Sequence, residues 1–351
     1  MTMVVIGVGM VGTSIALAAR RAGHRVHLRD RNTSHALVAA GLGAGSVDPV
    51  PPNEVDLVVV AVPPDHCARV IADSLLEHRS ATVTDVASVK GALIGQLRAL
   101  VDDEALRRYV GSHPMAGSHR SGPVSGDADL FVDRTWVLTP HRVNPDVDVA
   151  RVRRLATESG AVVTDMDPYD HDRAVAAVSH LPHVASVLVA DQMDDVPAEH
   201  LRLAGQGLRD VTRIAGSDPG LWVQILSANA AAVRPRLERL RTAVDALLAG
   251  FDDRERLVGA LQAGVAGTAR IPGKHGLADQ VWSEVVVEIP DTPGALAKLF
   301  AEVGEAGINI EDMSIEHDQN RQVGHLALLV DSVHESELRD QLAEHGWTVR
   351  P

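Results

Sequence analysis

A glycine triplet near the start of the chain constrains its fold more than any other feature. Gly7, Gly9 and Gly12 follow a short β-branched run, Met3 to Gly7, and open a helical pattern. In such an arrangement the first glycine permits a tight turn, the second lets the backbone approach a pyrophosphate, and the third lets the helix pack against the strand. The chain is therefore expected to begin with a strand–turn–helix unit that binds a dinucleotide; a glycine-rich turn without a cofactor is the alternative.

An acidic residue at the end of the second expected strand completes this fingerprint. Asp30 follows the strand Arg25 to Leu28, and its carboxylate is expected to bind the ribose hydroxyls and repel a 2′-phosphate. This favours NAD, although the neighbouring Arg29 and Arg31 leave NADP open. The other residues expected at the cofactor lie at the start of the first helix or after the third strand: Met10, Val11, Val62 and Pro63.

Changes in periodicity divide the chain into four parts. Over residues 1–165 short strands alternate with helical patterns, and the continuous apolar run 56–62 is typical of a strand buried on both faces, so we expect a doubly wound α/β domain. Only helical spacing is found in 166–263, which predicts an all-helical domain. A linker rich in glycine and basic residues is expected over 264–280. Residues 281–351 show the order βαββαβ, which predicts a ferredoxin-like domain.

Composition excludes several classes of protein. The 351 residues include 47 acidic and 33 basic side chains, a net charge of −14 that argues against nucleic acid as the main partner. A single cysteine, Cys67, cannot form an internal disulfide, which favours a reducing compartment, and we expect it to fill a helix rather than act as a thiol nucleophile. We find no secretion signal and no apolar run near the ~18 residues of a membrane span, so a cytoplasmic protein is expected.

A histidine marks the end of a further expected strand, Tyr109 to Ser112. His113 lies in GSHPMAG, at the carboxyl edge where ligands of open α/β sheets bind. It is a candidate base near neutral pH, and a purely structural loop histidine is the alternative. Ser88, in DVASVK after the strand Ala81 to Asp85, is expected to orient His113 by a hydrogen bond; a helix N-cap is its alternative role.

The segment VSHLPH falls within the first helix of the expected helical domain. Ser179 and His183 are four residues apart and share one helix face, and Pro182 is expected to bend the helix. His180 and His183 raise the alternative of a metal site, but no HExxH or comparable ligand set is present, and we expect no metal. Upstream lie Asp167, Asp170, His171 and Asp172. The acidic residues among them are interpreted as a helix N-terminus.

Two arginines are candidates for binding carboxylates. Arg209 and Arg213 are four residues apart in the helical segment GLRDVTRIA, which SDPGLW with Trp222 follows shortly after. Two guanidinium groups on one face can bind carboxylates bidentately. A solvated cationic face, or ion pairs with Asp210 and its neighbours, is the competing interpretation.

In this order and spacing, GxGxxG, DVASVK, GSHPMAG, SHLPH, GLRDVTRIA and SDPGLW resemble the prephenate/arogenate dehydrogenases over about residues 3–260. The resemblance implies a Rossmann domain, a helical dimerisation domain, NAD and a dicarboxylate substrate. It implies that His113 is the catalytic base or the hydrogen-bond acceptor for the ring hydroxyl, and that Ser88 orients His113 near the nicotinamide. Where the family often has an aromatic residue, this chain has Leu208. The implied substrate contacts, with the last two reaching across a dimer, are Ser179, His183, Arg213, Arg209 and Trp222.

The C-terminal segment resembles an ACT domain. The resemblance is carried by DTPGALAKLF, which begins at Asp291 and includes Gly294, and by GINI, which includes Asn309. These three residues are the expected effector contacts, and tyrosine, the end product of the pathway, is the expected effector. A purely structural or dimer-stabilising module is the alternative.

The resemblance predicts a homodimeric NAD-dependent prephenate dehydrogenase of tyrosine biosynthesis. Three alternatives stay open: oxidation of arogenate, oxidation of a β-hydroxyacid or imine on the same architecture, and a non-catalytic sensor of nucleotide and amino acid. The second would present a lysine in place of His113 as the central acid or base. The third conflicts with the presence of both His113 and Arg213.

Overall fold

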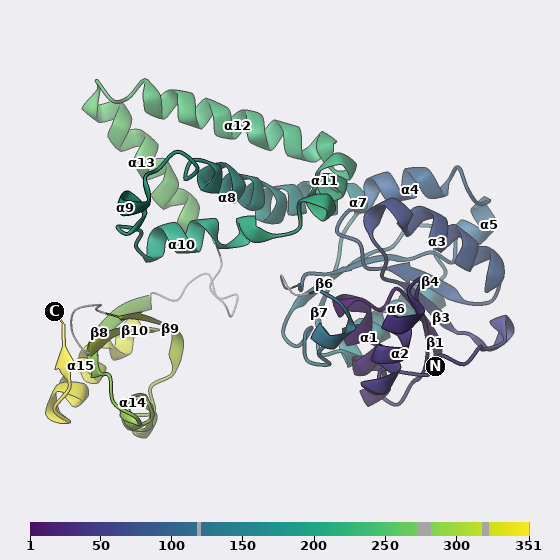
Figure 1. Cartoon of the computed structure of the whole chain (residues 1–351), viewed down its shortest axis with the longest axis horizontal. Helices are drawn as coiled ribbons and strands as arrows, with labels where there is room; N and C mark the ends of the chain where they lie inside the picture. Colours follow the sequence, from purple (N-terminus) through teal and green to yellow (C-terminus); the bar gives the residue numbers. More distant parts are fainter. Residues whose placement is uncertain (118–120, 272–281, 318–322, 351) are drawn as a thin grey trace. The chain divides into compact units, whose positions relative to one another are not determined.

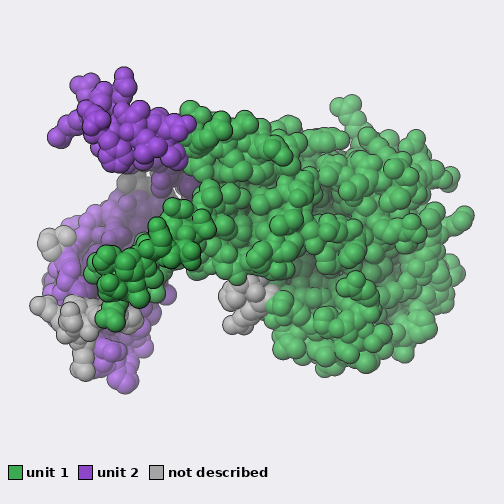
Figure 2. Space-filling view, turned by 45° about the horizontal axis from the view of Figure 1, so that its top comes forward, with its two compact units in different colours: residues 1–242 green, residues 243–351 purple. Residues whose placement is uncertain are grey.

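The computed structural model describes residues 1–117, 121–271, 282–317 and 323–350. These residues form two compact units, Met1–Thr242 and Ala243–Pro351, shown in separate colours in Figure 2. Unit 1 holds the α/β domain and most of the helical domain, and unit 2 holds the end of the helical domain and the C-terminal domain. Each unit is described by itself below.

The first half of the α/β domain is a parallel sheet whose two faces are both buried. Along β1, Met3 and Val5 enter one hydrophobic cluster and Val4 the other, and Leu57 and Val58 of β3 divide in the same way. This alternation explains why these strands are apolar throughout rather than amphipathic. In spatial order the strands are β2 (Arg25–Arg29), β1 (Thr2–Ile6), β3 (Leu57–Val60) and β4 (Thr82–Asp85).

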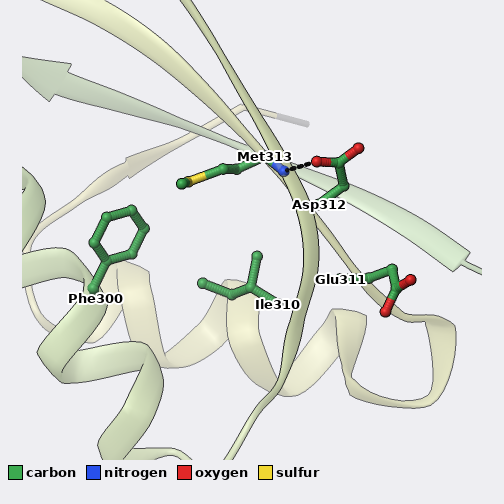
Figure 3. A pocket seen from close by; sticks show the side chains of 5 residues that line it. All are labelled: Phe300, Ile310, Glu311, Asp312 and Met313. Carbon is green, nitrogen blue, oxygen red and sulfur yellow. Dashed lines mark hydrogen bonds between the residues drawn. The ribbon is translucent and has the colours of Figure 1, made fainter. Parts of the chain in front are cut away.

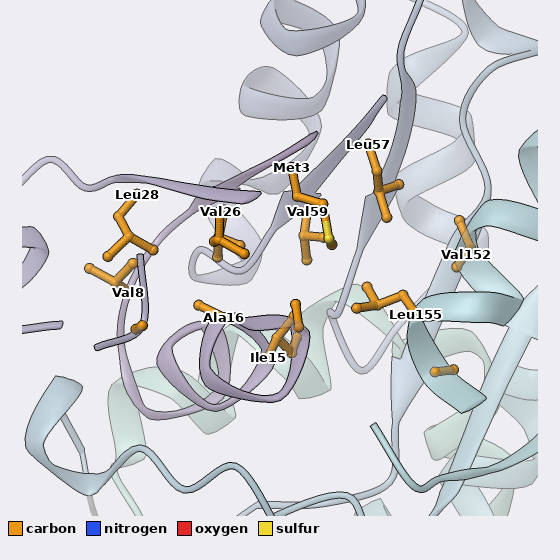
Figure 4. Packing of buried hydrophobic residues seen from close by; sticks show 14 of the residues in the cluster. Met3, Val8, Ile15, Ala16, Val26, Leu28, Leu57, Val59, Val152 and Leu155 are labelled. Atoms are coloured by element: carbon orange, nitrogen blue, oxygen red, sulfur yellow. The ribbon is translucent and has the colours of Figure 1, made fainter. Parts of the chain in front are cut away.

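Helices cover both faces of this sheet (Figure 1). One face packs against α1, with Ile15 and Ala16 among the valines and leucines of the strands (Figure 4). The helices contributing to that first cluster are α1 (Met10–Arg21), α2 (Thr33–Gly41) and α6 (Asp146–Glu158). The helices of the second cluster are α3 (Pro64–Glu77), α4 (Gly91–Leu97) and α5 (Asp103–Leu106).

The second half of the domain contains one antiparallel pair of strands. The strand β5 (Gly111–Pro114) runs antiparallel to β6 (Thr135–Thr139), which is parallel to β7 (Val162–Asp165). A bridge from Val83 to Tyr109 joins this sheet to β4. The strand expected over Tyr109 to Ser112 begins two residues later, at Gly111. His113 consequently lies within β5, opposite Val137.

The elements between Pro168 and Thr268 are all helices or helical turns, as expected. The first three elements are α7 (Pro168–Val175), a π-helical turn (Ala176–His180) and α8 (Leu181–Asp191). The π-turn arises where Pro182, which lacks an N–H, interrupts the hydrogen bonding; Leu181 donates to the carbonyl of Ala176, five residues back. The remaining helices are α9 (Ala198–Leu201), α10 (Gln206–Thr212), a 3-10 turn (Arg213–Gly216), α11 (Pro219–Ala228), α12 (Ala230–Leu248) and α13 (Arg254–Thr268).

Two expectations for the helical region need correction. Residues 264–268 of the expected linker continue α13, and 272–280 lie outside the described residues. Contrary to the expectation from the sequence, one described stretch, Pro168–Asp191, is long and apolar enough to cross a membrane by length and composition alone. Within unit 1, Asp172 of this stretch accepts hydrogen bonds from the backbone N–H groups of Lys90 and Gly91.

The C-terminal domain has the expected βαββαβ order. Its elements are β8 (Trp282–Pro290), α14 (Ala295–Glu305), β9 (Ile310–His317), β10 (Val323–Asp331), α15 (Glu335–Glu344) and β11 (Thr348–Val349). The four strands form an antiparallel sheet in the order β11-β8-β10-β9. Leu299, Val303 and Leu338 of the two helices are buried with the alternating apolar residues of β8 and β10.

Candidate active site

The glycine turn has the geometry that a dinucleotide requires. Gly7 has a φ of +90°, and a Cβ there would lie 2.4 Å from the Ala61 carbonyl oxygen. A Cβ on Gly12 would lie 1.9 Å from the Gly7 carbonyl oxygen, so this helix–strand contact depends on glycine. A Cβ on Gly9 meets nothing within 4 Å, which leaves open space at the N-terminus of α1 for a pyrophosphate.

This difference predicts different effects on the melting temperature for two alanine substitutions. Gly12→Ala should weaken NAD binding at least 10-fold and lower the melting temperature by about 2 °C or more, because overpacking costs ~1–3 kcal/mol. Gly9→Ala should weaken NAD binding with an unchanged melting temperature. Cofactor titration and thermal unfolding of both variants check this; equal melting temperatures for Gly12→Ala and the wild type would contradict the packing argument.

Asp30 lies beside the glycine turn, as expected. Its carboxylate accepts hydrogen bonds from the backbone N–H groups of Val8 and Asn32, at 2.8 and 2.7 Å. Arg29 is paired with Glu77 at 2.8 Å, so its guanidinium is already held by a carboxylate. Arg29 is one of the two arginines that could bind the 2′-phosphate of NADP, and its ion pair with Glu77 makes it less available for that role.

The other expected cofactor residues border the same turn. Met10 and Val11 form the first turn of α1, which has no acidic residue to compete with a phosphate. Val62 and Pro63 follow β3, and Val62 Cγ1 lies 3.0 Å from the position of a Cβ on Gly7. Cys67, one turn into α3, is buried; burial raises the pKa of its thiol, which agrees with a packing role.

His113 is held by a histidine from the helical domain. Its Nδ1 lies 2.9 Å from Nε2 of His171 on α7, and the two rings meet nearly at a right angle. The Nδ1 of His171 lies 3.0 Å from Asp172 Oδ1. Asp172 also accepts the backbone N–H groups of Lys90 and Gly91, at 2.8 and 2.7 Å, where α4 begins.

The charges near His113 favour its neutral form. Part of its surface stays accessible, yet burial lowers the pKa of His113 well below its ordinary value, and the positive charge of Lys90 lowers it further. Lys90 is fully buried and paired with Asp85, whose other oxygen accepts the hydroxyl of Tyr109 at 2.8 Å. His113 is therefore ready to accept a proton at neutral pH.

The structure gives His113 a different partner from the one expected. None of the hydrogen bonds between described residues joins it to Ser88, and His171 makes the orienting contact instead. Ser88 lies between Asp85 and Lys90, on the loop that leads into α4. It is not the N-cap of that helix either, since Lys90 occupies the N-cap position. The relevant signal in the sequence was the pair His171–Asp172, assigned there to a helix terminus.

A second group of aromatic side chains follows the π-turn. His183 is stacked on Trp222 with ring centroids 3.4 Å apart, and His180 meets Trp222 edge-on. Trp222 therefore contacts a histidine of its own protomer rather than only reaching across a dimer. Asn229 donates to His180 Nδ1 at 3.1 Å and to the Asp172 carbonyl at 2.9 Å, which connects this group to the His171–Asp172 pair. Burial lowers the pKa of His180 to about 4.

The remaining expected substrate residues lie on neighbouring helical segments. Arg209 is on α10 and Arg213 begins the 3-10 turn, and both segments pack against α8. Both side chains are exposed, and no ion pair within the described ranges involves them; Asp210 accepts from Gln206 instead. Ser179 is partly buried in the π-turn. Hydrogen bonds between described residues link none of these three to His113.

The acidic cluster has two roles. Asp167 caps α7, as expected for carboxylates at a helix N-terminus, by accepting the N–H groups of Tyr169 and Asp170. Asp172 instead caps α4 of the α/β domain. Among the described residues no three His, Cys, Asp or Glu side chains are grouped as metal ligands would be. The sequence alone did not indicate Lys90, Asp85, Tyr109 or Asn229.

Two hollows lie in the C-terminal domain, within its described residues. One, of about 470 Å³, is lined by Phe300 of α14 and by Ile310 and Met313 of β9, which face the same space, with Glu311 and Asp312 along the strand (Figure 3). The other, of about 570 Å³, is lined by Gly294, Lys298 and Trp347 among others. Asp291 and Asn309 line neither hollow.

Comparison with known proteins agrees with this architecture. The chain matches the model of the prephenate dehydrogenase nucleotide-binding domain over residues 15–165, that of the prephenate dehydrogenase dimerization domain over 167–263, and that of the ACT domain over 283–344. It is 36% identical over 327 residues to a probable prephenate dehydrogenase of Streptomyces niveus, covering 90% of both chains. It is 28% identical to the prephenate dehydrogenase of Bacillus subtilis, covering 90% of this chain and 88% of the relative.

Solved structures show the same similarity. The prephenate dehydrogenase of A. aeolicus, in complex with hydroxyphenyl propionate and NAD+, matches with a TM-score of 0.68 and 28% identity, covering 76% of this chain and 96% of that one. Synechocystis arogenate dehydrogenase matches with a TM-score of 0.63 and 26% identity, covering 76% and 98%. With its NAD-binding Rossmann domain, helical dimerisation domain and ACT domain, the chain belongs to the prephenate dehydrogenase family of NAD-dependent dehydrogenases.

Proposed function

We propose that this enzyme oxidises and decarboxylates prephenate to 4-hydroxyphenylpyruvate, in the cytoplasm, on the route to tyrosine. The observation that carries the proposal is a neutral His113 at the carboxyl edge of the sheet, within the nucleotide-binding domain and hydrogen-bonded to His171 of the helical domain. Similarity to prephenate dehydrogenases over nine-tenths of the chain supports it.

The chemistry needs one base and one hydride acceptor. Prephenate carries a ring hydroxyl opposite a quaternary carbon that bears a carboxylate. His113 removes the hydroxyl proton as the ring carbon gives up its hydride, and bound NAD supplies the site that accepts this hydride. Loss of carbon dioxide then makes the ring aromatic, so the residues of the chain need provide no second base for decarboxylation.

Binding of the substrate is proposed to depend on the helical domain. The two carboxylates of prephenate require cations, and the protein as a whole is acidic. Arg213 and Arg209 are exposed guanidiniums without an ion-pair partner among the described residues. Arg213 binds the ring carboxylate in this proposal, and Ser179, His183 and Trp222 line the pocket. Ser88 is proposed to lie near the nicotinamide ring of NAD.

Arogenate is the second candidate substrate, because an arogenate dehydrogenase is among the similar solved structures. Formation of reduced cofactor, followed by its absorbance, should be measured with prephenate and arogenate in parallel, each with NAD and NADP. Turnover with prephenate and NAD is the expected result. Turnover with arogenate alone would assign the other substrate, and no turnover under all four conditions would contradict a dehydrogenase of this type.

Two further proposals concern assembly and regulation. The helical domain exposes large apolar side chains, among them Val178, Leu203 and Val223 at 68%, 85% and 64%, which supports a homodimer through this domain. The ACT domain supports regulation by tyrosine, with Asp291, Gly294 and Asn309 as the proposed contacts.

A further inference from the structure

The proposed base belongs to a chain of three side chains that spans two domains. His113 lies on β5, and His171 and Asp172 lie on α7. The contacts run from His113 Nδ1 to His171 Nε2, 2.9 Å, and from His171 Nδ1 to Asp172 Oδ1, 3.0 Å. His171 is fully buried, so solvent does not compete for either of its ring nitrogens.

The surroundings of Asp172 determine where the protons lie. Its two oxygens accept the backbone N–H groups of Lys90 and Gly91, and one of them also faces Nδ1 of His171. A carboxylate surrounded in this way acts only as an acceptor, so His171 carries its proton on Nδ1. A neutral imidazole has one N–H, and the Nε2 of His171 therefore accepts a hydrogen bond from the Nδ1–H of His113.

We propose that His171, fixed by Asp172, is a positioning residue that holds His113 in the Nδ1–H tautomer and so presents a bare Nε2 as the base. This inference rests on the function proposed above and assigns roles to two residues outside it. In the reaction the hydroxyl O–H bond of the substrate breaks and an Nε2–H bond forms on His113. The positive charge that then arises on His113 is stabilised by the hydrogen bond from Nδ1–H to His171.

The other charged groups around His113 also favour its neutral form. Lys90, the N-cap residue of α4, acts on His113 through its charge and is itself paired with Asp85 at the end of β4. His180 approaches from the π-turn, with its own pKa lowered to about 4 by burial. A proton added to His113 would place a further positive charge near Lys90 inside the protein, which burial disfavours.

Two substitutions of His171 separate positioning from packing. His171→Leu retains apolar bulk but removes the acceptor, and we expect kcat to fall about 100-fold, within the usual contribution of an oriented general base, with little change in KM. His171→Gln retains a carbonyl acceptor for His113 and should recover at least a tenth of wild-type turnover. Asp170→Asn, an exposed neighbour that pairs with Arg173, is the matched control and should leave kcat unchanged.

The tautomer itself can be observed without turnover. In 15N-histidine NMR spectra of the full-length protein, the His113 signals are those lost in His113→Gln, and they should show a protonated Nδ1 and a bare Nε2. In His171→Leu they should shift toward the Nε2–H form. A protonated Nε2 on His113 in the wild type, or equal kcat for His171→Leu and the wild type, would overturn the inference. An enzyme inactive on both substrates would contradict the proposed function, while the NMR result would still decide the tautomer.

Discussion

Replacing His113 with alanine is expected to lower kcat for prephenate by about 100- to 10,000-fold, the usual contribution of general base catalysis. The KM should change little, because the proton is transferred only in the transition state and binding depends on other residues. Steady-state kinetics at saturating NAD measure both constants. An equal loss of binding and turnover would show that His113 mainly holds the substrate.

Two controls keep this result specific. His200→Ala, an exposed histidine on α9, should leave kcat unchanged, and NAD affinity should be retained in His113→Ala. The pH profile gives an independent check. Burial and the charge of Lys90 lower the pKa of His113 below the ordinary histidine value of 6.5. His113 therefore stays unprotonated when the pH falls to 6.5, and the acid limb of wild-type kcat/KM should lie below that pH. That limb should be lost in His113→Ala.

Replacing Arg213 with alanine is expected to raise the KM for prephenate by about 10- to 100-fold, with a smaller effect on kcat. Removing a charge-assisted hydrogen bond to a carboxylate typically costs ~1.5–3 kcal/mol, and a bidentate guanidinium contact is at the upper end. The measurement is the KM at saturating NAD, together with binding of hydroxyphenyl propionate in the presence of NAD. An unchanged KM would remove Arg213 from the substrate site.

Matched variants test the geometry of this contact. Arg213→Lys keeps the charge but loses the planar fork, so its KM should fall between those of the wild type and Arg213→Ala. Arg202→Ala removes another exposed arginine of the same domain and should leave the KM unchanged. If Arg202→Ala and Arg213→Ala raise the KM equally, the effect comes from the overall field rather than from a specific contact.

The local and repetitive features of the fold could be predicted from the sequence. The turn at Gly7, Gly9 and Gly12 and the apolar run of β3 each depend on neighbours within a few residues, and they lie where they were expected. The same holds for the βαββαβ order of the C-terminal domain. In each case a short stretch of backbone requires a particular residue type, which leaves a pattern in the sequence.

Features that depend on distant parts of the chain could not be predicted. The antiparallel direction of β5 follows from its pairing with β6, and a strand of four residues contains no signal for it. His171 and Asp172 resemble a helix N-terminus in sequence, and their contacts to His113 and Lys90 arise only when two domains pack together. Similarly, Ser88 was a plausible hydrogen-bond partner for His113, but in the folded chain the partner is His171, which is 58 residues further along the chain.

The attachment of Asp172 to the start of α4 has a consequence for the engineering of such enzymes. Chimeras are commonly built by joining one enzyme's cofactor domain to another's substrate domain, and residue 166, between the two matched regions, offers an obvious junction. A junction there separates His171 and Asp172 from the histidine and the backbone that they contact. A hybrid that changes cofactor preference without losing turnover must therefore inherit the beginning of α7 from the same parent as β5 and α4.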